Sequence, residues 1–340
     1  MRVVDRATSR NYMKYLNQAR TAYAETNEKI FSGKRFTAMS EDVSAGTRVL
    51  RARTDMNKVE VQLDNIKSIQ SELTTTEDSM TSINDVLSSV VGEKLLAAMD
   101  DSKAESGRTA LANEISSLRQ EILQFANTKF STRYLFGGSN SSGSAPFSTD
   151  ADGKLLYNGV DVSKVQRRED GSFFYLDAGA EKDIGLDEKV YLDIGLGIQM
   201  NGTTTDPNTA LQVSYSGLEI LGFGTNGGKS NNIFNILVDV EQNIRSFNKE
   251  KLGDLHAQLT EASDRFRANL TNIGAKTKML ESMQSRLEKT QDSYKTKIKD
   301  LMGIDDAEES MNQTMNDFVL KAVLQMGSNL LPVSLMDFLS

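Results

Sequence analysis

Glycine and proline are concentrated in the middle of this 340-residue chain, and their distribution limits what the two flanks can become. Proline occurs only at Pro146, Pro207 and Pro332, and 16 of the 24 glycines lie between Gly137 and Gly228. The flanks therefore contain few of the residues that interrupt helices most strongly. We expect long helices at both ends of the chain and a different kind of structure between them.

The first flank shows the spacing of a helix that packs on another helix. Its apolar stripe recurs every three or four residues, at Tyr12, Leu16, Ala19, Tyr23, Thr26 and Ile30. Ser32 and Gly33 are expected to end this helix, because glycine readily adopts the left-handed conformation of a helix C-cap. Ser40 or Asp42 then supplies the N-cap of a second helix.

The second helix is predicted over residues 43–100. Unbroken, it would be longer than roughly 75 Å, which is typical of a coiled coil or a rod. Its stripe consists of Val59, Leu63, Ile66, Leu73, Met80, Leu87 and Val91. A third helix is predicted over residues 105–130.

The middle of the chain carries the signals of short strands. Asn158-Gly159 separates two short apolar runs, and this dipeptide is the strongest short-range signal of a β-hairpin. Further strands are predicted over residues 172–176 and 189–194. We therefore expect a small, mostly β domain over residues 141–230.

Helical spacing returns after the glycine-rich region, over residues 233–244 and 255–301. The last forty residues add Met311, Met315 and Phe318 at helical spacing. The methionines Met311, Met315 and Met326 can form part of the core of a folded monomer, or they can form a contact surface in an assembly, since methionine adapts to irregular neighbours. The sequence leaves both readings open. Pro332 is expected to interrupt the last helix.

Helices of matching length at the two ends favour an antiparallel pairing. The predicted fold is mainly α with an inserted β domain (α+β), a long helical bundle with the β domain at its tip. The expected parts are a terminal helical assembly domain (1–40 and 301–340), a helical rod (41–140 and 231–300) and the insert (141–230). The first and last forty residues carry net charges of +5 and −5, so they should attract each other.

Motifs that could carry chemistry fail on inspection. The chain has no cysteine and only one histidine, His256, so a His-based metal cluster or catalytic triad cannot be assembled from several such residues. Residues 224–230 resemble the end of a phosphate-binding loop, but Phe223 stands where that loop needs glycine. Residues 150–153 resemble part of a calcium loop, but Gly159 occupies the position of its bidentate glutamate. The acidic run 305–309 is best explained as a helix start. We expect no enzyme activity, no cofactor and no metal site, and neither nucleic acid nor a membrane as partner.

Several segments resemble the flagellin superfamily, in order and over nearly the whole chain. Within it they resemble the family of the third hook-associated protein, which sits between the flagellar hook and the filament. The resemblance rests on Ser32, Gly33, Arg35 and Asp42 near the first helix end, on Asn127, Tyr134, Phe136, Gly138 and Phe147 around the start of the insert, and on residues 334–339. A divergent filament flagellin is the alternative. A cytoplasmic coiled-coil regulator or a helical enzyme is a third reading, which the failed cofactor motifs disfavour.

The resemblance implies a role as a structural adaptor outside the cell. The N-terminus lacks the apolar core of a signal peptide, and the resemblance implies export through the flagellar type III apparatus with an export chaperone. The implied partners are the first hook-associated protein, flagellin and copies of the chain itself in a ring.

The terminal stripes are the predicted assembly interface. Tyr12, Leu16, Tyr23 and Ile30 line one side of the first helix, and Met311, Met315 and Phe318 line one side of the last. We expect the two stripes to pack against each other. Since two narrow stripes cannot complete a core, neighbouring subunits should supply the third surface.

Overall fold

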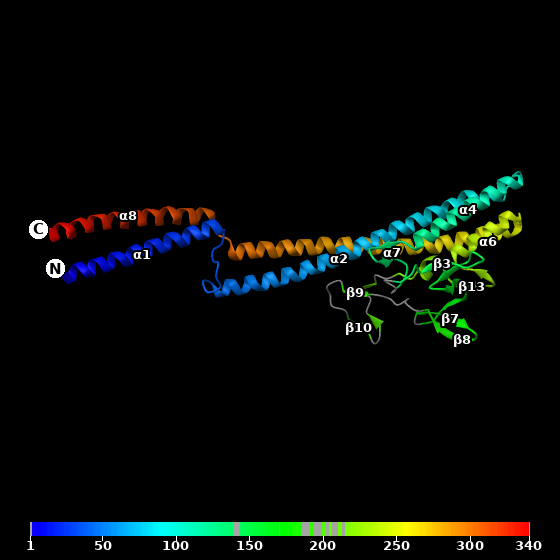
Figure 1. The fold of residues 1–340 in the computed structure, drawn as a ribbon, viewed down its shortest axis with the longest axis horizontal. Coiled ribbons are helices and arrows are strands. Elements are labelled where there is room, and N and C mark those ends of the chain that lie inside the picture. The colour runs from blue at the N-terminus through cyan, green and yellow to red at the C-terminus, as the bar shows by residue number, and fades with distance from the viewer. Residues whose placement is uncertain are drawn as a thin grey trace. The chain divides into compact units, whose positions relative to one another are not determined.

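The computed structural model divides the chain into two compact units (Figure 1). The terminal unit consists of residues 1–61 and 287–340, and the central unit of residues 62–286. Two long helices, α2 (Val43–Ser89) and α7 (Lys249–Met302), each contribute to both units. The structure describes residues 2–138, 143–169, 171–184, 191–193, 199–201, 204–205, 210–212 and 215–339.

The terminal unit is built on α1 (Arg2–Ser32) and α8 (Asp306–Leu339), which lie side by side (Figure 1). The two helices are antiparallel, and the chain termini lie at the same end of the pair. This confirms the pairing expected from the sequence. The expected break at Pro332 is wrong, because α8 continues through it to Leu339. A proline removes one helical hydrogen bond, and here that loss does not end the helix.

A second cluster of the terminal unit lies where α2 begins and α7 ends. Phe36, Ala45 and Val49 are buried there, and they pack against three residues near the end of α7. Those three are Ile298, Leu301 and Met302. The backbone N–H of Arg35 also donates to the Met302 carbonyl at 2.7 Å, which ties the segment after α1 to the end of α7.

The central unit holds most of the buried core. Besides its parts of α2 and α7 it contains α3 (Leu95–Ala98), α4 (Glu105–Ala126), α5 (Gly217–Leu221) and α6 (Ile233–Arg245). Helices α4 and α6 pack on each other. The third predicted helix is thus confirmed as α4, which ends four residues earlier than expected, and the fourth is confirmed as α6.

A π-helical segment, η1 (Val90–Lys94), separates α2 from α3. It changes the spacing of the buried residues, which runs Leu87, Val90 and then Leu95, all with no exposed surface. Val91, which the sequence placed in the stripe, is therefore only partly buried. Its carbonyl instead accepts a hydrogen bond from Nε2 of His256, at 3.1 Å. His256 is partly buried and contacts η1, so it does not stand free on the surface of its helix.

The middle of the chain forms small antiparallel sheets. Two have three strands, in the orders β3-β4-β5 and β6-β7-β8. Within the described residues there are also four two-stranded pairs: β1-β2, β9-β12, β10-β11 and β13-β14. The strand bounds are β1 Lys129–Phe130, β2 Arg133–Tyr134, β3 Phe147–Thr149, β4 Leu155–Tyr157, β5 Val160–Asp161, β6 Val165–Arg167, β7 Phe173–Asp177, β8 Ala180–Asp183, β9 Tyr191–Asp193, β10 Met200–Asn201, β11 Thr204–Thr205, β12 Ala210–Gln212, β13 Thr225–Asn226 and β14 Lys229–Ser230, with a 3-10 turn η2 at Val162–Lys164.

The predicted hairpin is present between β4 and β5. Asn158 and Gly159 both have positive φ, 49° and 81°, as a two-residue hairpin turn requires. The strand predicted at 172–176 is β7. Within 189–194 only β9 is described, and residues 189, 190 and 194 lie outside the described residues. The fold class is thus confirmed as long helices with small antiparallel sheets, while the three-part domain division stays a prediction.

Candidate assembly interface

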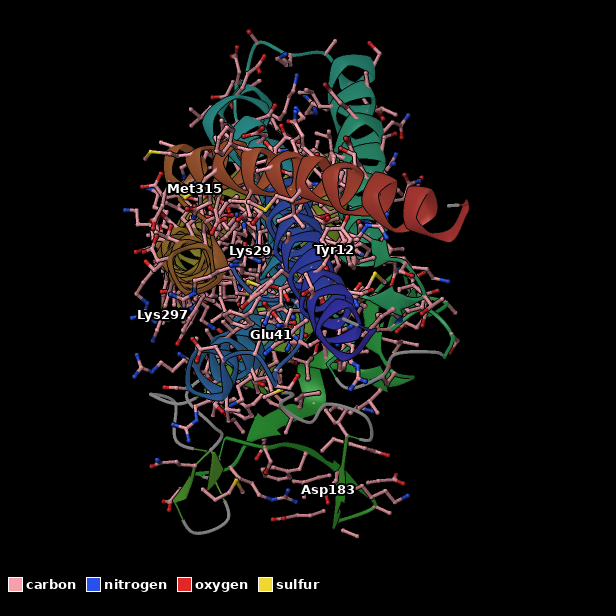
Figure 2. The ribbon with its side chains drawn as sticks, turned by 90° about the vertical axis from the view of Figure 1, so that its left-hand side faces the viewer. Tyr12, Lys29, Glu41, Asp183, Lys297 and Met315 are labelled. Atoms are coloured by element: carbon pink, nitrogen blue, oxygen red, sulfur yellow. The ribbon has the colours of Figure 1, made fainter. Side chains whose placement is uncertain are left out.

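The helix α1 turns its predicted stripe toward α8. Leu16 is 9% exposed, Ala19 and Thr26 are buried, and Tyr12, Tyr23 and Ile30 are half-buried. The backbone of Gly327 in α8 lies so close to Tyr12 that an added Cβ would overlap the phenol oxygen. Figure 2 labels Tyr12 and Lys29 on α1 and Met315 on α8. The structure thus places the four predicted residues of α1 along its contact with α8.

The helix α8 does not pack as predicted. Met311, Met315 and Phe318, which we call the ridge, are 69%, 65% and 72% exposed. They do not pack against α1, so this part of the prediction is wrong. The less exposed positions of α8 follow a different four-three spacing, at Glu309, Gln313, Asn316, Leu320, Val323 and Gly327. The apolar pattern misled because the most apolar stripe of a helix need not be buried within its own chain.

Hydrogen-bonding and charged groups face each other across the pair. Asn316 Nδ2 donates to Thr26 Oγ1 at 2.8 Å, and Gln313 Nε2 donates to Asn27 Oδ1 at 2.7 Å. Lys29 and Glu309 form an ion pair at 3.7 Å. The opposite charges of the first and last forty residues therefore meet at one specific ion pair within the described residues. Sequence reasoning missed Gln313 and Asn316, although their four-three spacing with Glu309 was a usable signal.

An apolar groove runs beside the ridge. It has a volume of about 530 Å³ and lies between α1 and α8. Most of its walls are apolar, with Tyr12, Tyr15, Ala19 and Ala22 on one side and Val319, Val323 and Met326 on the other. On the outer edge of α8, a hydrogen bond from Lys321 to Asp317 raises the pKa of the Lys321 amine. Ridge and groove together give the pair a large unpartnered apolar surface.

The residues at the end of α1 form one hydrogen-bonded corner. Gly33 has φ of +63°, which ends α1 as predicted. Asp42 caps α2 through its Oδ1, which accepts from the Ala45 N–H at 2.9 Å, while its Oδ2 pairs with Arg35 at 3.0 Å. The Ser32 hydroxyl accepts from the backbone N–H of Lys34 at 3.3 Å. These motif residues therefore shape the connection between α1 and α2.

The second group of motif residues forms a buried cluster in the central unit. Phe136 and Phe147 are each 2% exposed, and the Phe147 ring lies 5.1 Å from that of Tyr157. Tyr134 is 9% exposed. Gly138 has φ of +62°, and its N–H donates to the Tyr215 carbonyl at 3.2 Å.

Close packing around Gly217 holds this cluster together. An added Cβ there would overlap Phe147 Cζ and lie 3.0 Å from the Phe136 carbonyl oxygen. Burial raises the pKa of the neighbouring Tyr215 phenol. These residues pack the base of the insert against the helices, and sequence reasoning missed Gly217 because only the fold brings it to Phe147.

Asn127 joins α4 to this cluster. Its Nδ2 donates to the Phe147 carbonyl at 3.0 Å, and its Oδ1 accepts from the Phe147 N–H at 3.1 Å. Replacing Asn127 by Ala removes both bonds and leaves both backbone groups without partners. We expect the free energy of unfolding of the central unit to fall by about 2 kcal/mol.

Urea unfolding followed by circular dichroism measures this change. The Asn127→Asp variant serves as the comparison, because it keeps the acceptor for the N–H and loses the donor to the carbonyl. It should be intermediate in stability. An Ala variant as stable as the parent would mean that the two bonds contribute nothing.

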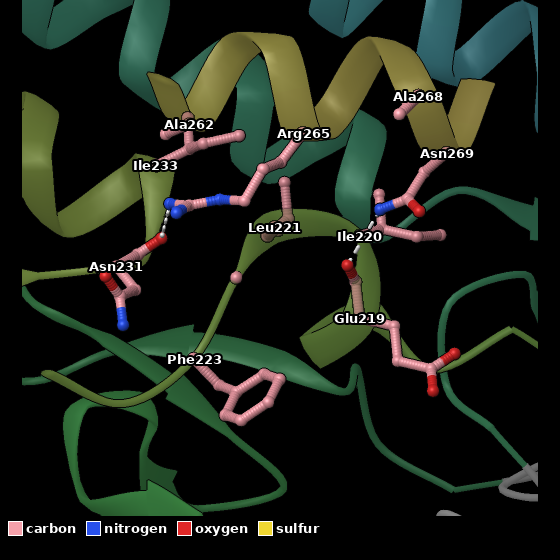
Figure 3. Close-up of a pocket in the computed structure, with 11 residues that line it drawn as sticks. Glu219, Ile220, Leu221, Phe223, Asn231, Ile233, Ala262, Arg265, Ala268 and Asn269 are labelled. Atoms are coloured by element: carbon pink, nitrogen blue, oxygen red, sulfur yellow. Dashed lines mark hydrogen bonds between the residues drawn. The ribbon is translucent and has the colours of Figure 1, made fainter. Parts of the chain in front are cut away.

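A pocket of about 470 Å³ lies in the central unit, between α5 with the segment after it and one face of α7 (Figure 3). Arg265 Nη2 donates to the Asn231 carbonyl at 3.4 Å, and Asn269 Nδ2 donates to the Glu219 carbonyl at 2.9 Å. Its polar side chains thus hold neighbouring backbone in place. Its remaining walls are mainly aliphatic and aromatic.

The motifs rejected at the sequence level have ordinary structural roles. Residues 224–230 form the β13-β14 hairpin, whose turn carries Gly227 and Gly228 at positive φ. Asp150 Oδ1 accepts from two backbone N–H groups in the turn between β3 and β4. Asp305 Oδ1 caps α8 by accepting from Ala307 and Glu308 N–H. Among the described residues there is no group of three or more potential metal ligands, and no helix there is long and apolar enough to span a bilayer.

Residues 4–141 match the family model of the bacterial flagellin N-terminal helical region. The structure resembles that of a putative flagellar hook-associated protein from Vibrio parahaemolyticus, with a TM-score of 0.58 and 14% identity, over 77% of this chain and 100% of that chain. A flagellar junction protein, FlgL, from Legionella pneumophila matches with a TM-score of 0.48 and 16% identity, over 75% and 100% of the two chains.

No curated protein sequence matches the chain. At 14% identity the Vibrio structure supports the fold alone. The family model covers the first two fifths of the sequence, which contain α1 and the hydrogen-bonded corner after it. Both observations agree with the resemblance in the motif residues. Residues 4–141 therefore resemble a bacterial flagellin N-terminal helical region, and the chain that carries them shares the fold of a putative flagellar hook-associated protein.

Proposed function

We propose that this chain is a structural subunit of the bacterial flagellum that joins the hook to the filament. The observation that carries this proposal is the ridge on α8, in a chain whose α1 lies within a flagellin N-terminal helical region. A helix that has already paired with α1 and still exposes two methionines and a phenylalanine favours further neighbours. Burying each such side chain contributes about 1.5–3 kcal/mol, so a ring of copies gains substantially from covering the ridge.

The junction is favoured over the filament by the motif around the insert. Tyr134, Phe136, Gly138 and Phe147 resemble the pattern of the third hook-associated protein, and they form one buried cluster here. The Vibrio structure with the same fold is described as a putative flagellar hook-associated protein. A divergent filament flagellin, which would polymerise in many copies, is the alternative.

The proposed partners follow from this position. The chain would contact the first hook-associated protein on the hook side, flagellin on the filament side and copies of itself within a ring. It would reach the outside of the cell through the flagellar export apparatus, with a chaperone. Its role would be structural, and no catalytic step is proposed for it.

Immunogold labelling of intact flagella tests the position. We expect label at the boundary between hook and filament and none along the filament, because an adaptor is present only where the two structures meet. Label along the whole filament, with the chain abundant in sheared filaments, would identify a filament flagellin instead. Label confined to the cytoplasm would contradict both assignments.

A further inference from the structure

One backbone carbonyl changes its partner where the helix passes through η1. In a regular α-helix the N–H of Leu95 would donate to the carbonyl of Val91, four residues earlier. Here it donates to the carbonyl of Val90, five residues earlier, which is the bond that defines a π turn. The Val91 carbonyl therefore loses its regular helical donor. Because α3 begins at Leu95, the change is confined to this one turn.

A side chain of α7 takes the place of the lost donor. Nε2 of His256 lies 3.1 Å from the carbonyl oxygen of Val91. A carbonyl oxygen can only accept a hydrogen bond, so the ring carries a proton on Nε2. Both residues are half-buried, and a carbonyl in such a place needs a partner from the protein more than one on an open helix surface. The imidazole thus supplies the bond that the helix no longer makes.

The π turn decides which side chain enters the core. Five residues of a regular helix turn through about 500°, so Leu95 would point about 140° away from Val90. Lys94 would point within about 40° of Val90 and would take the buried side instead. With the π turn, Val90 and Leu95 both have no exposed surface. Nζ of Lys94 pairs with Glu114 of α4 at 2.8 Å, so the extra residue buries a leucine and directs a lysine to an ion pair.

The burial of Leu95 carries a backbone cost. A buried acceptor without a partner destabilises a fold by more than an average hydrogen bond stabilises it. The π turn creates such an acceptor at Val91, and the donor from His256 removes the penalty. Only with this donor does the burial of Leu95 remain a net gain.

We propose that His256 is a positioning residue that holds the π turn, and that it thereby keeps Leu95 in the core and fixes the rotation of α3. The only histidine of the chain has a conformational role, which it exerts through one backbone carbonyl. Both partners lie within the central unit. The role therefore does not depend on the proposed function or on the terminal helices.

Two substitutions separate the donor from the ring. His256→Phe keeps a ring and loses the donor, whereas His256→Gln loses the ring and keeps an amide N–H that can donate to the same carbonyl. In the full-length chain, His256→Phe should lower the unfolding temperature of the central unit by about 3–6 °C, because the Val91 carbonyl loses its partner. His256→Gln should recover at least half of this loss.

Hydrogen exchange followed by mass spectrometry shows where the lost bond acts. In His256→Phe, amides of residues 90–99 should exchange at least about fivefold faster, since a buried acceptor without a partner favours local opening. Exchange in α4 should change by less than about twofold, because α4 does not contain the affected turn. Gln258→Ala is the matched control, because Gln258 also lies on α7 but donates to the carbonyl of Ser230. It should leave exchange over residues 90–99 unchanged.

Four results would overturn the proposal. Unchanged exchange over residues 90–99 in His256→Phe would mean that the bond does not hold the π turn. Equal acceleration there and in α4 would mean that His256 supports the whole unit. Equal losses in the Phe and Gln variants would assign the effect to the shape of the ring. Acceleration over residues 90–99 in Gln258→Ala would mean that any change in this part of α7 has the same effect. If His256→Phe does not fold, slow exchange over residues 90–99 in His256→Gln supports the donor role, and fast exchange there contradicts it.

Discussion

Bacteria whose only copy of this chain carries Phe318→Asp are expected to make hooks but no filaments. Phe318 is 72% exposed on α8, so the substitution removes almost no buried surface from the monomer. In an assembly that covers the ridge, the same substitution would bury an unpaired carboxylate, which costs several kcal/mol or keeps the subunits apart. The loss should therefore appear in assembly and not in folding.

Electron microscopy of the cells and an assay for flagellin released into the medium measure this effect. Purified Phe318→Asp protein should unfold at the same temperature as the parent chain. Asn312→Asp is the matched control, because it adds the same charge at an exposed polar position of α8. Normal filaments in the Phe318→Asp strain would show that the ridge is not an assembly surface.

Leu16→Asp provides a contrast within the same pair. Leu16 is 9% exposed against α8, so an aspartate there is buried inside the terminal unit itself. We expect α1 and α8 to separate in the isolated chain, with both ends becoming sensitive to limited proteolysis. The two substitutions thus distinguish the inner contact of the pair from its outer surface.

A methyl group added at Gly217 is expected to cost the central unit about 3 kcal/mol. The Cβ of Gly217→Ala would overlap Phe147 Cζ, and Phe147 is itself buried at 2% exposure. The ring cannot move freely, because its backbone is held on both sides by Asn127. For a unit of this size the unfolding temperature should fall by about 6–12 °C.

A double-mutant cycle identifies the cause. Phe147→Ala alone should cost about 3–5 kcal/mol through the cavity that it leaves. In that background Gly217→Ala should cost less than about 1 kcal/mol, because the ring that it overlaps has gone. Thermal unfolding of the four proteins gives the coupling. If the two costs simply add, the destabilisation comes from the backbone at Gly217 and not from contact with the ring.

The helices and their ends were largely predictable from the sequence. Gly33 ends α1 and Asp42 caps α2, as their local chemistry predicts. The hairpin at Asn158 and Gly159 follows from a dipeptide whose preferred backbone conformation is fixed by short-range sterics. Such features depend on a few neighbouring residues, so one sequence is enough to find them.

The outward face of α8 could not be predicted in the same way. Hydrophobic spacing identifies a stripe, but it does not say whether the covering surface belongs to the same chain. Met311, Met315 and Phe318 form the more apolar stripe, while Gln313 and Asn316 make the contact with α1. The cluster around Phe147 was predicted as a motif only, since its contact with Gly217 joins residues 70 positions apart in the sequence.

The π-helical segment η1 has a consequence for changes in chain length. In a regular buried helix, the deletion of one residue rotates everything beyond it by about 100° and turns buried side chains outward. Between Val90 and Leu95 the chain already contains one residue more than a regular helix would need for the same buried stripe. Deleting Gly92 would bring Leu95 and Ala98 into regular spacing with Leu87 and Val90, with both still on the buried side. The η1 segment can therefore lose one residue without turning the buried side chains of α3 outward.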